Sequence, residues 1–471
     1  MDLMIPFADN KSAPYYEQIY CFIKREIQEG RIGAGEKLPS TRQLAEKLSV
    51  SRSTTQLAYD QLVAEGYLEA RPCRGYYVAE VESLLAMPER GAEETALAPE
   101  ENRGKQDGNW LLDFSPRGID LGHFPFSVWR KLSRETLQAG NREFFASGLP
   151  RGEQRLRRAI CDYLQASRGI HCRPEQVVVG AGSEYLLMLL WQVTGKRRIA
   201  MENPTYRQAS RVLQGLGHDI VPVAMDRSGM RADLLACSGA DMAYIMPSHQ
   251  FPTGAVMSVS RRREILNWSA EAPGRYLIED DYDSEFRYRG RPIPALCGSD
   301  YTGRVIYLGT FSKAVAPAIR VSYMVLPEEL NRRYDEVCGF YASTVSRVDQ
   351  EILARFLEEG YFELHRTLRR GIYRNKPEAL LEALEPLRKD FRISGEMAGL
   401  HLLLESRRGE REETLIARAA EAGVRVYGLS AYFLEPAESH TVILGYANLE
   451  EEEIRRGVQT LREAWNGKNP T

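Results

Sequence analysis

Apolar residues near the start of the chain recur at the spacing of a helix. Four of them lie three or four positions apart and predict an amphipathic helix that ends at the glycine-rich segment 30–35: Tyr16, Ile19, Ile23 and Ile27. Two shorter helices are predicted over residues 38–48 and 52–65, because each starts near a serine or threonine that can cap it. Segment 67–78 predicts two strands with a tight connection.

Beyond residue 110 the pattern changes to short apolar runs that alternate with helical segments. Seven runs predict strands: Val177–Gly180, Arg198–Met201, Asp219–Ala224, Asp241–Met246, Arg275–Glu279, Arg304–Leu308 and Arg320–Leu326. Helical patterns such as 184–193 and 261–270 fall between several of them. This alternation favours an α/β fold with a mostly parallel seven-stranded sheet. After about residue 360 we expect a long helix over 371–387 and a small C-terminal α+β subdomain.

Residues 81–110 are interpreted as a linker. They are charged, contain proline and glycine, and lack regularly spaced apolar residues. They separate a small N-terminal domain at 11–80 from a large domain at 111–471, and a chain of 471 residues is long enough to hold both.

The composition is that of an ordinary globular protein, with 43% hydrophobic and 27% charged residues. No apolar run approaches the ~18 residues of a membrane span. The N-terminus also lacks the pattern of a signal peptide, so we expect a cytoplasmic protein without a membrane partner. Seven scattered cysteines without a Cys-x-x-Cys pattern favour reduced thiols over a disulfide frame or a metal site.

The N-terminal pattern of short helices, a brief turn and two strands is typical of a winged helix-turn-helix, which binds double-stranded DNA. The third helix would enter the major groove. The candidate DNA contacts lie in its first turn, in the second helix and in the wing: Arg52, Ser53, Thr54, Thr55, Arg42 and Arg74. Ten Lys and Arg against nine Asp and Glu give residues 11–80 a net charge of only +1, so a helical interaction module with solvated arginines is an alternative.

Lys313 is the most informative residue of the large domain. It follows an apolar run that predicts a buried strand, and a lysine there is costly unless it reacts or pairs with an anion. Ser312 beside it and Arg320 seven residues later could bind a phosphate group. Gly182 and Ser183 stand at another strand-to-helix turn, where backbone N–H groups bind anions, although such turns are common.

Other polar residues follow further predicted strands. Asp280 comes after the apolar residues Tyr276–Ile278, so its carboxylate is expected to face inward and to need a partner. Tyr206 could stack on a flat ring, or it could simply pack in the core. Open α/β sheets bind ligands at the carboxyl ends of their strands, so these residues indicate one ligand site.

Together these groups meet the chemical needs of pyridoxal 5′-phosphate. Lys313 would form a Schiff base with its aldehyde, and Asp280 would keep its ring nitrogen protonated. Tyr206 would stack on the ring, and Tyr282 would donate to its phenolic oxygen. The phosphate group would be bound by four residues: Gly182, Ser183, Ser312 and Arg320.

Three N-terminal segments, Leu38–Ala45, Val50–Thr54 and Leu62–Leu68, closely resemble the GntR-family DNA-binding domain. Residues 110–460 resemble a fold-type I, aspartate-aminotransferase-like domain. The fused order of the two, together with segments 247–254, 278–286 and 308–313, resembles the MocR/GabR family of bacterial transcriptional regulators. The resemblance implies a homodimer in which each DNA-binding head reaches its partner's large domain. Such a dimer would read an operator with repeated or palindromic half-sites.

The chain departs from the family pattern at the residues that bind a substrate carboxylate. Aminotransferases of this fold carry an arginine on a late strand, and GABA-sensing relatives carry one in an earlier turn, but segments 441–447 and 426–433 contain none. Arg207 and Arg425 could replace it, or each could form a surface ion pair. The departure argues against ordinary transamination and against GABA as the effector.

The preferred interpretation is a transcriptional regulator that binds pyridoxal phosphate on Lys313 and senses a small molecule. The effector would be pyridoxal phosphate itself or an amino compound, and the target genes would serve vitamin B6 or amino-acid metabolism. The missing arginines slightly favour pyridoxal phosphate itself. An active aminotransferase with a DNA-binding appendage is the main alternative, and a dimer whose cofactor only stabilises the fold is the third.

Overall fold

The chain divides into two compact units, Met1–Gln106 and Asp107–Thr471. The computed structural model describes residues 5, 14–72, 74–79, 110–120, 122–283, 293–396 and 399–466, without the side chains of residues 370, 372 and 374. The linker predicted at 81–110 lies outside the described residues, apart from Trp110.

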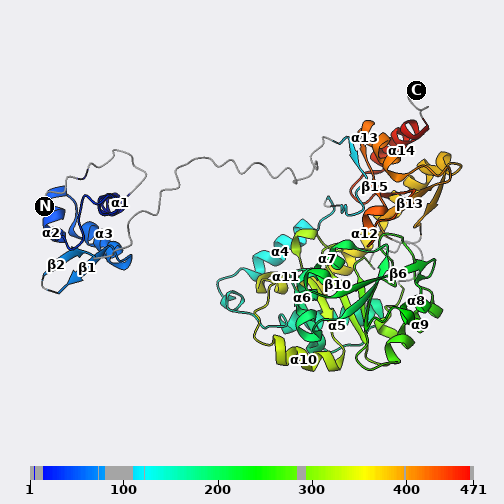
Figure 1. Ribbon diagram of the computed structural model, residues 1–471, viewed down its shortest axis with the longest axis horizontal. Coiled ribbons are helices and arrows are strands. Elements are labelled where there is room, and N and C mark those ends of the chain that lie inside the picture. Colours follow the sequence, from blue (N-terminus) through cyan, green and yellow to red (C-terminus); the bar gives the residue numbers. More distant parts are fainter. Residues whose placement is uncertain are drawn as a thin grey trace. The chain divides into compact units, whose positions relative to one another are not determined.

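The described residues of the N-terminal unit form three helices and a two-stranded sheet, which can be followed in Figure 1. Its elements are α1 (Tyr15–Gln28), α2 (Thr41–Leu48), α3 (Arg52–Ala64), β1 (Leu68–Arg71) and β2 (Gly75–Val78). Strands β1 and β2 pair antiparallel to form the wing. Ser40 and Ser51 cap α2 and α3, because each side chain accepts a hydrogen bond from the third backbone N–H of its helix. The predicted winged helix-turn-helix is confirmed.

A mixed sheet of eight strands lies at the centre of the second unit. Its strands are β4 (Val177–Gly180), β5 (Arg198–Asn203), β6 (Asp219–Asp226), β7 (Gly229–Met230), β8 (Met242–Ile245), β9 (Tyr276–Asp281), β10 (Val305–Thr310) and β11 (Ser322–Val325). Their spatial order is β4-β11-β10-β9-β8-β5-β6-β7. The pairs from β10 through β6 are parallel, whereas β11 runs antiparallel to both of its neighbours.

All seven predicted strands are present, but the predicted number of seven is wrong by one. The additional strand, β7, has two residues and forms a tight hairpin with β6. Gly229 has a φ of +94° there, in the left-handed region that favours glycine. Two residues are too few to produce an alternating pattern, so the sequence carried no signal for this strand.

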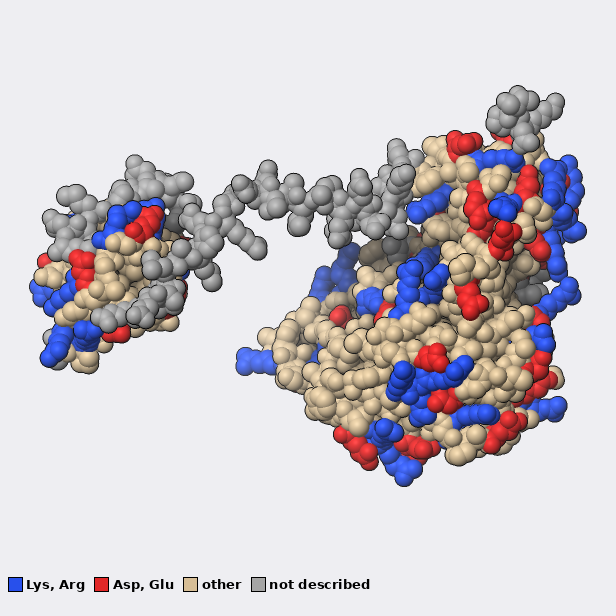
Figure 2. All heavy atoms as spheres, in the orientation of Figure 1, with Lys and Arg blue, Asp and Glu red and all other residues tan. Residues whose placement is uncertain are grey.

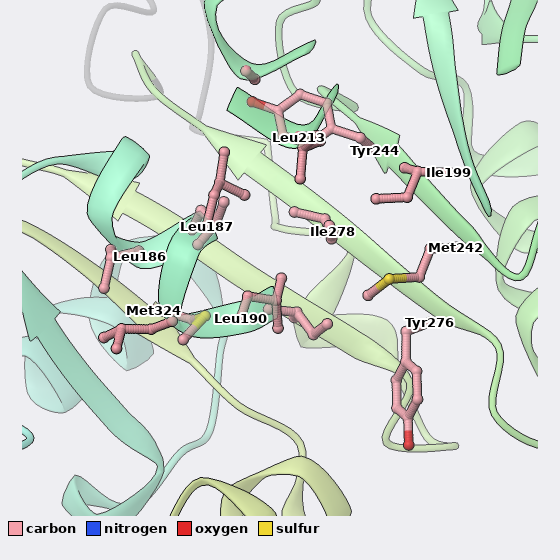
Figure 3. Packing of buried hydrophobic residues seen from close by; sticks show 14 of the residues in the cluster. Leu186, Leu187, Leu190, Ile199, Leu213, Met242, Tyr244, Tyr276, Ile278 and Met324 are labelled. Carbon is pink, nitrogen blue, oxygen red and sulfur yellow. The ribbon is translucent and has the colours of Figure 1, made fainter. Parts of the chain in front are cut away.

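Helices cover both faces of the sheet, which makes a three-layer α/β/α unit (Figure 1). They are α4 (Phe126–Thr136), α5 (Gln154–Arg168), α6 (Ser183–Thr194), α7 (Arg207–Gly215), α8 (Ala232–Cys237), α9 (Val259–Ala270), α10 (Glu328–Cys338) and α11 (Arg347–Glu358). On one face, leucines of α6 pack against strand residues that include Ile278 and Met324 (Figure 3). Helices α5 and α11 cover the other face. Burial on both faces explains why the strands read as continuous apolar runs.

The C-terminal part forms the expected α+β subdomain. Its elements are α12 (Tyr361–Leu384), β12 (Phe391–Ser394), β13 (His401–Ser406), α13 (Glu412–Glu421), β14 (Val424–Arg425), β15 (Tyr427–Gly428), β16 (Thr441–Gly445) and α14 (Glu451–Asn466). Strands β12, β13, β16 and β15 form an antiparallel sheet, and β14 pairs with β3 (Leu112–Asp113). Helix α12 begins ten residues before the predicted start at 371, because Gly371 lies inside the helix and does not open it. No helix of the described residues is long and apolar enough to cross a membrane.

Candidate cofactor site and DNA-binding surface

One cavity of the second unit brings together all eight residues that the sequence indicated for a cofactor. They are Gly182, Ser183, Tyr206, Asp280, Tyr282, Ser312, Lys313 and Arg320. The segments that carry them follow or end β4, β5, β9 and β10. These strands are parallel to one another, so their carboxyl ends share one edge of the sheet, as expected for a ligand site in this type of fold.

The part of the cavity next to α6 has the donors that a phosphate group requires. Gly182 precedes the first residue of α6 with a φ of +99°, and a Cβ there would lie 2.3 Å from Nη2 of Arg320. Arg320 itself has a left-handed backbone and donates to Glu184 at 2.8 Å. The Ser312 hydroxyl is buried and has no hydrogen-bond partner among the described residues. A buried hydroxyl without a partner, an arginine and a helix N-terminus together fit an anion.

Asp280 supplies the acid of the cavity. Its side chain is buried and accepts a hydrogen bond from the hydroxyl of Tyr244, a residue of β8 that the sequence analysis did not single out. Burial raises the pKa of Asp280 to about 6, although the Tyr244 hydrogen bond and the Lys313 charge oppose this shift. The neighbouring groups therefore do not fully stabilise the negative charge of Asp280. Such a carboxylate is suited to pair with a protonated ring nitrogen.

Lys313 lies beside aromatic rings in the same cavity. Its Nζ is 4.5 Å from the centroid of the Tyr282 ring and 5.9 Å from that of Phe251. Burial lowers the pKa of Lys313, against the opposing charges of Asp283 and Asp280. A lower pKa increases the fraction of neutral amine, which is the form that attacks an aldehyde.

The backbone that follows Lys313 is fixed by an arginine of α12. Arg369 donates to the carbonyl oxygens of Lys313 at 3.1 Å, of Ala314 at 3.2 Å and of Asp120 at 2.9 Å. A single buried guanidinium therefore joins the lysine loop, the segment before α4 and the long C-terminal helix. Arg369 was not predicted as a site residue, because a helical arginine usually faces solvent.

A buried histidine and aspartate lie behind Tyr282. His249 Nδ1 is 2.7 Å from Asp283 and 3.0 Å from the Tyr282 hydroxyl. Burial is the largest influence and acts to raise the pKa of Asp283, but His249 and the charges of Lys313 and His401 together outweigh it and the pKa is lowered. This pair fixes the position of Tyr282. Both residues lie in the segments 247–254 and 278–286, but no local pattern predicts that they meet, because they are 34 positions apart.

Replacing His249 by glutamine is expected to lower the free energy of unfolding of the second unit by about 3 kcal/mol near neutral pH, because it removes the partner of a buried carboxylate. Since the folded pKa of Asp283 is depressed, this stabilisation is present at neutral pH and is lost as the pH falls. Urea unfolding followed by tryptophan fluorescence reports this unit, because all five tryptophans lie beyond residue 107. The matched variant His171→Gln changes an exposed histidine and should behave like the wild type; an equal loss in both variants would contradict the assignment.

The two arginines named as replacement carboxylate partners are not in the cavity lining. Arg425 pairs with Asp113 at 3.6 Å and lies over the rings of Trp110 and Tyr427. Arg207 begins α7 and does not line the cavity either. The lining instead includes Arg117, which the sequence analysis did not single out.

The side chains predicted to contact DNA are mostly exposed on the N-terminal unit. Arg42, Arg52, Ser53 and Arg74 are exposed, and Thr54 is half-buried with its hydroxyl 2.7 Å from that of Ser51. Arg42 is paired with Glu46 at 3.2 Å. Figure 2 shows basic side chains at the end of this unit where Figure 1 places the wing. An exposed basic wing beside the first turn of α3 is suited to a polyanion.

The prediction that Thr55 contacts DNA is wrong. Its side chain is fully buried, and its hydroxyl donates to the carbonyl oxygen of Thr41 at 2.8 Å. It therefore joins α3 to α2 inside the unit and cannot reach DNA.

Comparison with known proteins supports the assignment of both units. The family model described as "Bacterial regulatory proteins, gntR family" matches residues 15–78, and the model "Aminotransferase class I and II" matches residues 119–461. The probable rhizopine catabolism regulatory protein MocR of Rhizobium meliloti is 33% identical, over 98% of this chain and 96% of that protein. The chain belongs to the MocR/GabR family of transcriptional regulators.

Other members of the MocR/GabR family are similar over nearly the whole chain. The HTH-type transcriptional regulator YdeL of Bacillus subtilis is 39% identical, over 96% of this chain and 97% of the relative. The HTH-type pyridoxine biosynthesis transcriptional regulator PdxR of Corynebacterium glutamicum is 30% identical, over 96% of each. This MocR/GabR protein is therefore a transcriptional regulator with a GntR-type DNA-binding unit and an aminotransferase-like unit.

Solved structures of aminotransferases have the same fold as the second unit of this MocR/GabR protein, which we call the effector unit. The multiple substrate aminotransferase of Thermococcus profundus has a TM-score of 0.68 and 26% identity, over 76% of this chain and 92% of that one. The kynurenine aminotransferase of Pyrococcus horikoshii, solved with PMP, has a TM-score of 0.67 and 24% identity, over 76% and 91%. The fold-type I prediction is confirmed.

Proposed function

We propose that this regulator binds pyridoxal 5′-phosphate covalently through Lys313 and uses the occupancy of that cavity to control its affinity for operator DNA. The observation that carries the proposal is the convergence of all eight predicted residues on one cavity. The regulated genes would serve vitamin B6 or amino-acid metabolism, since one relative is named as a regulator of pyridoxine biosynthesis.

Each group of the cavity has a separate task in this proposal. The phosphate would be bound by the start of α6, the free Ser312 hydroxyl and Arg320, which would exchange Glu184 for the ligand. When bound, the cofactor supplies an electron-withdrawing ring and a reactive aldehyde carbon. Asp280 would hold a proton on the ring nitrogen, and Tyr282, fixed by His249, would donate to the phenolic oxygen.

The experiment that tests the proposal measures DNA affinity with and without the cofactor. Short duplexes that the full-length protein binds are first selected from random sequences, and the Kd for the best duplex is then measured for the cofactor-free and the loaded protein. A ligand can shift the protein between two states only if it has different affinity for them, so we expect the two Kd values to differ at least several-fold. Equal Kd values at full loading would refute the proposal, and steady transamination by a protein that binds no duplex would favour an aminotransferase with an appendage.

We propose Arg52 and Arg74 as DNA contacts in the recognition helix and the wing. Replacing either by alanine should weaken binding to the selected duplex about tenfold, in line with the cost of one lost contact. A phosphate contact would also reduce the slope of log Kd against log salt, whereas a base contact would relax sequence preference. The charge-matched control is Arg31→Ala, which removes a cation of the same unit that pairs with Glu26. An equal loss in the control and the test variants would mean that overall charge, not position, controls binding.

We also propose that the regulator acts in the cytoplasm as a homodimer. Two DNA-binding units related by a two-fold axis can bind two half-sites at once, which raises both affinity and specificity. Sedimentation of the loaded protein with the selected duplex measures the stoichiometry, and two chains per duplex are expected.

A further inference from the structure

One cation of the cofactor cavity has no task in the proposed function. Arg117 lines the cavity together with Lys313 and Arg320. Arg320 pairs with Glu184 and lies against Gly182, on the side suited to the phosphate. In the part of the chain that the structure describes, no carboxylate lies within ion-pair distance of the Arg117 guanidinium, so its charge is available to a ligand.

The backbone that carries Arg117 is held in a tight turn. The N–H of Gly118 donates to the carbonyl oxygen of Ser115 at 3.1 Å, and the N–H of Arg117 approaches the Ser115 hydroxyl at 3.4 Å. On one side, the side chain of Asn448 donates to the carbonyl oxygen of Asp113 at 3.1 Å. These hydrogen bonds hold the backbone of the turn, and with it the backbone of Arg117, in one conformation.

This turn packs directly on β16, the late strand that lacks an arginine. The N–H of Gly445 donates to the carbonyl oxygen of Phe114 at 2.9 Å. A Cβ at Gly445 would lie only 2.0 Å from the carbonyl oxygen of Ser115, so glycine is required for the turn to come so close. Strand β16 itself contributes the apolar Ile443 to the core. Arg117 therefore stands in the segment that packs directly on the strand that lacks an arginine.

The position of Arg117 relative to the cofactor residues follows from two further observations. Its Cζ lies 5.9 Å from the centroid of the Tyr206 ring, the ring proposed to stack on the cofactor. Its charge also acts to lower the pKa of Lys313, which places it within electrostatic range of the reactive amine. Arg117 remains exposed, so a ligand can reach it from solvent.

We propose that Arg117 binds the carboxylate of an amino acid whose amino group faces Lys313, so that the effector of this regulator is an amino carboxylate and not a simple amine or the cofactor alone. The inference rests on the proposed function, because it assumes a cavity loaded with pyridoxal phosphate. A planar guanidinium can donate two parallel hydrogen bonds to a carboxylate, which a neutral side chain cannot reproduce.

The test compares amino acids with the amines that result when the carboxylate is removed. The loaded full-length protein is titrated calorimetrically with glycine, L-alanine, D-alanine, β-alanine and GABA, and with methylamine, ethylamine and propylamine as the matched amines. The variants are Arg117→Gln, Arg117→Lys and, as a control from just outside the cavity, Arg207→Gln. Absorbance of the lysine-bound cofactor is recorded for each variant, so that loading is measured separately from ligand binding.

The wild type is expected to bind at least one amino acid at least about tenfold more tightly than its matched amine, as expected for a charge-assisted pair. Arg117→Gln should remove this preference without changing the affinity for the amine, Arg117→Lys should restore part of it, and Arg207→Gln should retain it. A wild type without the preference, an Arg117→Gln variant that retains it, or a loss in Arg207→Gln alone would overturn the inference. A wild type that does not load the cofactor would instead refute the proposed function.

Discussion

Replacing Lys313 by alanine is expected to abolish covalent attachment of pyridoxal phosphate. Lys313 is the lysine that lines the cavity among the described residues, and its Nζ lies over the Tyr282 ring next to the proposed phosphate donors. An imine can form only with an amine, so no other residue of the described lining can replace it. Reduction of the loaded protein with borohydride, followed by mass spectrometry of the peptide that contains residue 313, measures the attachment.

Lys389→Ala is the matched control for this experiment, because Lys389 is an exposed lysine of the same unit. The control should carry the reduced cofactor on residue 313 like the wild type. Cofactor retained at another lysine in Lys313→Ala, in the same amount as in the wild type, would contradict the assignment. DNA affinity of Lys313→Ala should then no longer respond to added pyridoxal phosphate.

Replacing Asp280 by asparagine is expected to have opposite effects on cofactor affinity and on stability. Affinity for pyridoxal phosphate should fall at least about tenfold, because the ring nitrogen loses its charged partner. The cofactor-free protein should become more stable at pH 8, because the variant no longer buries a carboxylate. With a folded pKa of about 6 against an ordinary value of 3.8, that carboxylate costs about 3 kcal/mol above pH 6.

The sign of the pH dependence follows from the raised pKa. Between about pH 4 and pH 6 the folded wild type binds a proton that the unfolded chain has released, so its stability falls as the pH rises through this range. The variant lacks this group, so the two proteins should converge near pH 4 and differ most above pH 6. Urea unfolding followed by tryptophan fluorescence at pH 4.5, 6 and 8 measures the difference. If the free energies of unfolding of the two proteins instead differed by the same amount at all three pH values, Asp280 would not be buried as an uncompensated acid.

The sequence alone was sufficient to predict the site residues that lie at or just beyond the ends of buried strands. Lys313 and Asp280 stood out because a charged residue directly after an apolar run must have a partner, and parallel strands bring such ends together. Thr55 could also have been placed correctly, since it lies on one helical face with the buried residues Ala58, Tyr59 and Leu62.

The remaining parts depend on contacts that no local pattern encodes. Arg117 stands in a loop that packs on Gly445, more than 300 residues later in the chain, and lines the cavity from there. Arg369 and the His249–Asp283 pair likewise owe their roles to distant partners. The sequence does not mark Arg117 as a carboxylate partner, because it lies far from the late strand and the turn, segments 441–447 and 426–433, where related proteins carry such an arginine.

The pairing of β3 with β14 concerns the segment that leads from the N-terminal unit into the second unit. Trp110 is the first described residue after the N-terminal unit, and the first strand that follows it, β3, is hydrogen-bonded to β14 of the C-terminal subdomain and not to the central sheet. Arg117 lies four residues beyond this strand. A carboxylate bound at Arg117, as proposed, would therefore contact the short segment between Trp110 and Arg117 through which the second unit is covalently continuous with the rest of the chain.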